Sequence, residues 1–138
     1  MTAKEKQIAL ARYRIKQAEE AIDEAEFLLS GKKSPRSIMN RAYYGMFYAV
    51  LALLIFEPYA SSKHSGVLSY FNRQFIKKGI LPKDMGQAIN TAFELRQRAD
   101  YREYADISLE QAEPYINKAR IFIVAVKEYL ESNIFRME

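Results

Sequence analysis

The sequence predicts an all-α protein, an up-and-down bundle of four to five antiparallel helices in a single domain over residues 1–138. Apolar residues recur at spacings of three and four in several long segments, and no competing run has the two-residue period of a strand. Hydrophobic residues make up 49% of the chain and charged residues 28%, a balance typical of a globular domain. At 138 residues the chain is long enough to bury one core.

The first helix is expected to begin after Thr2. Thr2 and Glu5 have the spacing of a capping box, in which each side chain accepts a hydrogen bond from a free backbone N–H at the helix start. One apolar face then continues for about six turns, formed by Ile8, Ala11, Ile15, Ala18, Ile22, Ala25 and Leu29. We expect Gly31 to end this helix in a left-handed cap.

The second helix is expected over residues 35–56, with Ser34 and Pro35 at its start and Pro58 beyond its end. Its side chains are apolar or aromatic nearly all round, a pattern typical of a helix that other helices surround. Gly45 lies in its middle, where glycine costs roughly 1 kcal/mol relative to alanine. We therefore expect another helix to approach closely at Gly45.

Three more helices are expected in the second half of the chain. One leads from the region of His64 to residue 76 and is closed by Gly79, a second covers about residues 85–99, and a third covers about 109–131. Residues 100–107 are expected to form a loop, and Ser108 with Gln111 repeats the capping-box pattern. Pro114 leaves two readings, a kink inside the last helix or a later start near Glu113.

The composition excludes several classes of function. The chain has no cysteine and one histidine, so disulfides and thiolate metal sites are excluded, and no metal-spacing motif is present. We expect neither a metal nor a cofactor. The uncharged stretch of residues 42–56 is shorter than the ~20 residues of a membrane-spanning helix, and the charged N-terminus lacks a signal-peptide pattern, so we expect a cytoplasmic protein. A net charge of +4 favours acidic partners such as RNA.

Arg41 is the one charged residue between Arg36 and Glu57, on a helix predicted to be buried. A buried charge needs a partner, and helix geometry places Tyr44 on the same face as Arg41. One reading is a structural ion pair with a carboxylate such as Asp100 or Glu94. The other is a functional pocket in which a cation lies beside phenolic hydroxyls.

Two further positions could carry chemistry. His64, the sole histidine, lies at a predicted helix start, where it is either a general base or a hydrogen-bonded structural residue. The densest polar cluster begins at the C-terminal end of the fourth helix and comprises Arg96, Arg98, Asp100, Tyr101, Arg102, Glu103, Tyr104 and Asp106. Its arginines could bind phosphate and its tyrosines could stack on bases, although a solvated helix end would have the same composition.

Three blocks together resemble, in order and separation, the signatures of one branch of the HEPN family: SIMNRAYYGMF at residues 37–47, KHSGV at 63–67 and LRQRADY at 95–101. The resemblance covers nearly the whole chain. It implies a helical bundle that pairs into a homodimer, often encoded beside a nucleotidyltransferase-fold partner in prokaryotic toxin–antitoxin pairs. It also implies, for many members, metal-independent ribonuclease activity from an arginine followed four to six residues later by a histidine.

Arg96 matches the arginine of that motif, but Tyr101 stands five residues later, and a phenol with a pKa near 10 is a poor acid–base group at neutral pH. The resemblance therefore favours binding of a nucleotide, RNA or the partner protein at a dimer cleft. The expected cleft residues are Arg41, Tyr44, His64, Arg96, Arg98, Asp100, Tyr101 and Tyr104. We expect Arg41 to hold the end of the fourth helix, and Tyr101 or Tyr104 to be the tyrosine that a partner adenylates.

Two alternatives stay open from the sequence. One is a metal-independent ribonuclease toxin that uses Arg96 with His64 or Tyr101. The other is a helical dimerisation scaffold without catalytic activity. The gene neighbourhood and assays of RNA degradation would distinguish these functions.

Overall fold

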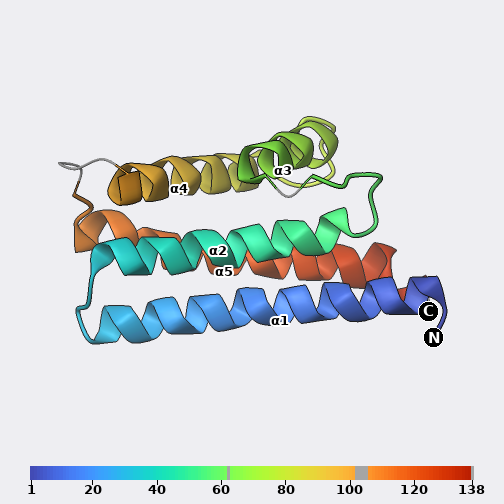
Figure 1. Cartoon of the computed structure of the whole chain (residues 1–138), viewed down its shortest axis with the longest axis horizontal. Helices are drawn as coiled ribbons and strands as arrows, with labels where there is room; N and C mark the ends of the chain where they lie inside the picture. The colour runs from blue at the N-terminus through green and yellow to red at the C-terminus, as the bar shows by residue number, and fades with distance from the viewer. Residues whose placement is uncertain (62, 102–105, 138) are drawn as a thin grey trace.

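A computed structural model describes residues 1–61, 63–101 and 106–137, and every regular element in these ranges is helical. The helices are α1 (Ala3–Ser30), α2 (Pro35–Leu54), α3 (His64–Phe71), the π-helix η1 (Asn72–Ile76), α4 (Lys83–Tyr101), α5 (Leu109–Asn133) and the 3₁₀ turn η2 (Phe135–Met137). The long helices run alternately up and down, and α2 lies between α1 on one side and α3 with α4 on the other (Figure 1). The predicted all-α bundle is confirmed.

Helix α2 is the central element of the bundle. It contacts α1, α3, α4 and α5, and twelve of its residues are buried, from Ile38 to Leu54. Its start is as predicted, because the Ser34 hydroxyl accepts a hydrogen bond from the Ser37 N–H and Pro35 is the first helical residue. The core of the protein therefore surrounds the helix that the sequence predicted to be enclosed.

Gly45 marks a close approach of α1 to α2. A Cβ built at this position would lie 2.6 Å from Cδ1 and 2.9 Å from Cγ1 of Ile22, and 3.4 Å from the carbonyl oxygen of Ala18. A side chain would overlap the buried Ile22, so the glycine permits the contact between the helices. The predicted close approach is confirmed.

The end of α1 differs from the prediction. Gly31 has a φ of −89°, and Lys32, with a φ of 51°, is the left-handed residue. The Lys33 N–H bonds to the carbonyl of Leu28 and the Lys32 N–H to that of Leu29, the hydrogen bonds of a Schellman motif. The motif is centred one residue later than predicted, because the helical conformation continues through Gly31.

The capping boxes at the starts of α1 and α5 are both confirmed. The Thr2 hydroxyl accepts from the Glu5 N–H at 3.1 Å, and the Ser108 hydroxyl accepts from the Gln111 N–H at 3.2 Å. Helix α5 therefore starts at Leu109, which excludes the start near Glu113, and Pro114 lies inside it. Pro114 has no backbone N–H to donate to the carbonyl one turn earlier in the helix. That carbonyl lies in the exposed first turn of α5, where water can reach it.

The helix predicted from His64 to residue 76 is two helical segments. After α3, the chain widens into the π-helix η1, in which the Lys77 N–H bonds to the Asn72 carbonyl at 2.8 Å. Gly79 then turns the chain with a φ of 76°, as its predicted closing role requires. Helix α4 continues through Asp100 to Tyr101, two residues past the predicted end, so these two residues lie on the helix, while residues 102–105 of the predicted loop lie outside the described residues.

The core is one cluster of side chains contributed by α1, α2, α3, η1, α4 and α5. Aromatic rings connect its distant parts; Phe71 of α3 and Phe122 of α5 lie 5.6 Å apart between ring centroids. In the described ranges, no helix combines the length and apolarity that crossing a membrane requires.

Candidate functional site

The candidate site begins with a contact between the middle of α2 and the first residue of α3. The hydroxyl of Tyr43 lies 2.9 Å from Nδ1 of His64. The imidazole also stacks on the ring of Phe47, with centroids 4.1 Å apart and planes inclined by 14°. Tyr43 is completely buried, and His64 is half-buried at the surface above it. The contact fixes the imidazole orientation and occupies one of its two nitrogens.

The side chain of Arg96, from α4, packs against the rings of Tyr43 and Tyr44. The guanidinium carbon of Arg96 lies 5.5 Å from the ring centroid of Tyr43 and 5.2 Å from that of Tyr44, within the range of cation–π attraction. Nε of Arg96 is 3.4 Å from a carboxylate oxygen of Asp100, one turn further along α4. We call Tyr43, Tyr44, His64, Arg96 and Asp100 the Arg96 cluster.

Arg96 is held firmly but is not saturated with hydrogen bonds. Its side chain is 14% exposed, and the buried Nε has no hydrogen-bond acceptor of suitable geometry among the described residues. The ion pair with Asp100 is therefore looser than a bidentate arginine–carboxylate pair. An anion with better placed oxygens could compete with Asp100 for this guanidinium.

The electrostatics of the cluster favour a neutral imidazole. Burial lowers the pKa of His64 below its ordinary value of 6.5, and the positive charge of Arg96 lowers it further. Burial raises the pKa of Tyr43 far above its ordinary value, an effect that Arg96 partly offsets. At neutral pH, Tyr43 is protonated and can donate its hydrogen bond to a neutral His64.

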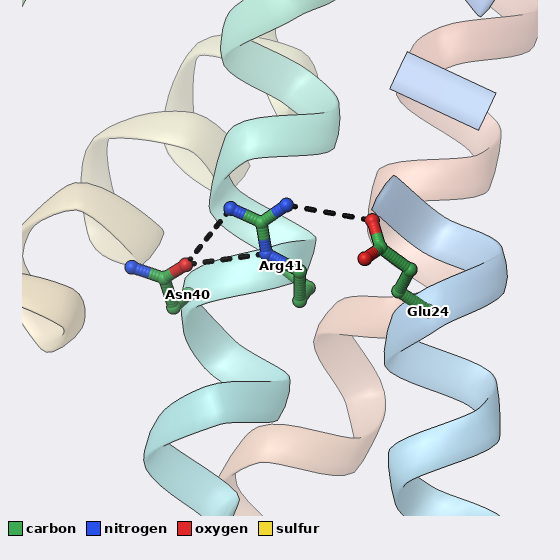
Figure 2. Close-up of polar contacts among 3 residues, drawn as sticks. All are labelled: Glu24, Asn40 and Arg41. Atoms are coloured by element: carbon green, nitrogen blue, oxygen red, sulfur yellow. Dashed lines mark hydrogen bonds and ion pairs between the residues drawn. The ribbon is translucent and has the colours of Figure 1, made fainter. Parts of the chain in front are cut away.

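Arg41 lies beside the Arg96 cluster, with its guanidinium carbon 5.4 Å from the ring centroid of Tyr44 as the shared helix face predicted, but its ion-pair partner corrects two other predictions. Its guanidinium pairs with Glu24 of α1 at 3.5 Å and bonds to the side-chain oxygen of Asn40, as Figure 2 shows, in place of Asp100 or Glu94. Its side chain is 28% exposed, so the charge is not fully buried. Arg41 therefore links α2 to α1, and Arg96 itself, not Arg41, forms the contacts between α2 and the end of α4.

The remaining predicted site residues are Arg98, Tyr101 and Tyr104. Arg98 is exposed, and it lies about 200° around α4 from Arg96, because it is two positions further along the helix. Tyr101 is the last residue of α4, and Tyr104 lies outside the described residues. The structure thus brings together His64, Arg96, Asp100 and Tyr44, places Arg41 beside the ring of Tyr44, and separates Arg98 from them.

Tyr43 is the site residue that sequence reasoning missed. Its position on the apolar face of α2 predicts a core residue, which it is. A buried tyrosine usually finds a partner for its hydroxyl, and the sole histidine of the chain was a candidate. Within the described ranges, no group of three or more acidic, histidine or cysteine side chains is arranged to hold a metal ion.

Comparison with known proteins assigns the chain to a family. The model of the HEPN domain matches residues 11–129. A UPF0332 protein of Thermotoga maritima is 40% identical over 131 residues, covering 95% of this chain and 96% of the relative. Two Methanocaldococcus jannaschii proteins, named "Putative toxin MJ0142" and "Putative toxin MJ0605", are 38% and 32% identical and cover 90% and 83% of this chain and 84% of each relative. The chain belongs to the HEPN family.

Proposed function

We propose that this HEPN protein is a toxin-type protein that binds RNA by holding a backbone phosphate at the Arg96 cluster. The observation that carries the proposal is the meeting of Arg96 and His64, from two different helices, around the ring of Tyr43. The names of the M. jannaschii relatives support a toxin-type role. The net charge of +4 favours the approach of a polyanion.

The chemistry of the cluster suits a phosphodiester. A guanidinium presents its N–H donors in a planar fork that matches two phosphate oxygens, and the 14% exposed side chain of Arg96 forms only a loose ion pair with Asp100. Asp100 must give way, which its 25% exposed side chain and its 3.4 Å contact permit. Tyr44, half-buried beside the guanidinium, offers a ring for a base to stack on.

Binding of fluorescein-labelled single-stranded RNA, followed by anisotropy, tests this function. Arg96→Ala removes the phosphate ligand and should weaken binding roughly tenfold or more, because charge-assisted hydrogen bonds contribute about 1.5–3 kcal/mol each. Arg98→Ala is the matched control, since it removes the same charge from the exposed side of α4. Equal losses from the two substitutions would show only general electrostatic attraction and would contradict the proposed site.

A second candidate function is metal-independent cleavage of the bound RNA, and the neutral state of His64 beside Arg96 favours it. In this function His64 takes the tautomer in which Nδ1–H donates to the hydroxyl oxygen of Tyr43, so that the unprotonated Nε2 would take the proton of a ribose 2′-hydroxyl as its oxygen attacks phosphorus. The bond to the 5′-oxygen then breaks, and the imidazolium returns the proton to that oxygen. The products are a 2′,3′-cyclic phosphate and a 5′-hydroxyl, with Arg96 stabilising the charge on the phosphorane.

Incubation of RNA with the protein in EDTA tests cleavage separately from binding. An active ribonuclease should yield cyclic-phosphate ends, and His64→Gln should abolish cleavage while retaining binding. If His64→Gln cleaves at the wild-type rate while Tyr101→Phe does not, Tyr101 replaces His64 as the acid–base group. If the wild type binds RNA without cleaving it, the cleavage function is wrong and only the binding function stands.

The assembly expected from the resemblance is part of the proposal. We infer a homodimer in which two Arg96 clusters face a shared cleft, and a nucleotidyltransferase-fold partner that modifies Tyr101 or Tyr104. Sedimentation at micromolar concentration tests the dimer, and a monomer there would contradict the shared cleft. Mass spectrometry of the chain after co-expression with its genomic neighbour tests the modification of tyrosine.

A further inference from the structure

A groove with both polar and apolar lining residues lies between α3 with η1 on one side and α4 on the other. Its volume is about 910 Å³. Ser65, the residue after His64, and Phe93 of α4 both line it. The ring of Phe93 lies 6.4 Å from that of His64 and 5.7 Å from that of Tyr43, between centroids. The groove therefore continues directly from the Arg96 cluster.

The wall formed by α3 and η1 carries positive charge at its far end. Ser65, Ser69, Arg73 and Lys77 line the groove at intervals of four residues, so they form one strip along the helical segment. The strip extends about 18 Å from its first to its last residue. The hydroxyls lie near the Arg96 cluster, and the two cations lie away from it.

The opposite wall carries neutral polar groups and one carboxylate. Asn90 and Thr91 of α4 line the groove with Glu94. The cations therefore all stand on the α3–η1 wall, and the negative charge stands on the α4 wall. This asymmetry favours a phosphate backbone along α3 and η1, with bases directed toward the amide and hydroxyl groups of α4.

Contacts between the two walls give the groove a fixed shape. The Asn72 side chain donates to Asn90 Oδ1 at 3.0 Å and to the Leu68 carbonyl at 2.8 Å. A Cβ at Gly86 of α4 would lie 2.8 Å from Asn72 Oδ1, so α4 and η1 approach closely at this point. The π-helix that carries Asn72 is a local geometry that occurs frequently at functional sites.

We propose that this groove binds the segment of single-stranded RNA that flanks the phosphate held at Arg96. The inference rests on the proposed function and extends it to a defined track on one protomer. Arg73 and Lys77 neutralise successive phosphates, and Phe93 offers a ring beside His64, the combination of charge and aromatic surface that single strands bind. The hydroxyl and amide side chains provide partners for the ribose 2′-hydroxyl, which distinguishes RNA from DNA.

Two neighbouring lysines provide the test. Lys77 lines the groove, and Lys78 is also exposed but does not line it and donates a hydrogen bond to Gln74. The affinity of the full chain for oligouridylates of two and eight nucleotides should be measured with Lys77→Ala, Lys78→Ala and Arg96→Ala. Both lysine variants should keep the wild-type melting temperature because both side chains are exposed.

The groove predicts a dependence on RNA length. Lys77→Ala should weaken binding of the octanucleotide about fivefold at 0.1 M salt and reduce its salt slope by about 0.7, because one phosphate contact on a single strand is lost. Binding of the dinucleotide should depend on Arg96 and not on Lys77. Lys78→Ala should match the wild type for both lengths, and the deoxyribose octamer should bind more weakly than the RNA.

The contrary outcomes separate the two proposals. Octanucleotide binding that depends on Arg96 but responds equally to Lys77→Ala and Lys78→Ala overturns the groove and leaves the proposed function standing. Absence of RNA binding by the wild type overturns both. Equal binding of the deoxyribose octamer overturns the assignment of the groove to RNA.

Discussion

The hydroxyl of Tyr43 lies 2.9 Å from Nδ1 of His64, and this hydrogen bond joins the buried centre of the bundle to its candidate functional surface. Tyr43 is completely buried in α2, whereas His64 begins α3 after the connection that leaves α2. Arg96 lies against the ring of the same tyrosine. One core residue therefore positions both a titratable base and a cation, and the geometry of the site depends on how α2, α3 and α4 pack.

The pKa of His64 should rise when Arg96 is replaced by alanine. The positive charge of Arg96 disfavours the imidazolium, so its removal leaves burial as the remaining cause of the lowered pKa. Because His64 is the sole histidine, one imidazole resonance reports it in an NMR titration. Arg98→Ala should leave the titration unchanged, and an unchanged pKa in Arg96→Ala would show that the two side chains do not interact in solution.

The free energy of unfolding should fall as the pH drops below about 6.5, the ordinary pKa of histidine. The folded protein holds His64 at a lower pKa than the unfolded chain, so the unfolded state binds more protons in this interval and is favoured by acid. The stabilisation is complete above the unfolded pKa and is lost as the pH falls through the folded pKa. Urea titrations between pH 5 and 7 should show this slope, and His64→Gln should flatten it. A slope that persists in the variant would assign it to other groups.

Tyr43→Phe should lower the free energy of unfolding by about 0.5–1.5 kcal/mol, the net contribution of one hydrogen bond. In a His64→Phe background the same substitution should be neutral or stabilising, because the buried hydroxyl of Tyr43 has already lost its partner. A double-mutant cycle measured by urea denaturation gives this coupling. A coupling energy near zero would mean that the hydroxyl and the imidazole do not depend on each other.

Gly45→Ala should destabilise the protein by about 1 kcal/mol. The overlap with Ile22 costs roughly 1–3 kcal/mol, and the better helix propensity of alanine returns about 1 kcal/mol. In an Ile22→Ala background the new methyl enters vacated space, so Gly45→Ala should become neutral or stabilising. Thermal unfolding of the four proteins measures the difference, and equal effects in both backgrounds would show that Ile22 is not the obstructing side chain.

Arg120→Ala should cost more stability than Arg41→Ala. Arg120 of α5 contacts two carboxylates of α1, Glu26 at 2.7 Å and Asp23 at 3.2 Å, whereas Arg41 has one carboxylate partner at 3.5 Å. Exposed pairs contribute at most about 1 kcal/mol each, so the difference should be a fraction of that and should shrink in 1 M salt. Urea denaturation at low and high salt measures it, and a larger loss from Arg41→Ala would restore Arg41 as a key structural charge.

Much of the fold follows from local sequence. The two capping boxes, the Ser34–Pro35 start and the turn at Gly79 depend on interactions within a few residues, and the structure confirms each of them. The left-handed residue of the cap was predicted at Gly31 but is Lys32, since both residues can adopt the conformations that a Schellman motif requires. The π-helix could not be predicted, because its apolar spacing matches that of an α-helix over so short a segment.

The candidate site depends on contacts between distant helices. The sequence by itself determined that the chain forms a helical bundle and that α2 is enclosed, because helical periodicity and composition are local properties, and it offered Arg41, His64 and Arg96 as candidate polar residues. Only the tertiary structure decided that Arg41 faces Glu24 and that Arg96 and His64 meet at Tyr43. The rotation of each helix about its axis is set by the packing of the whole core, and that rotation determines which polar side chains meet.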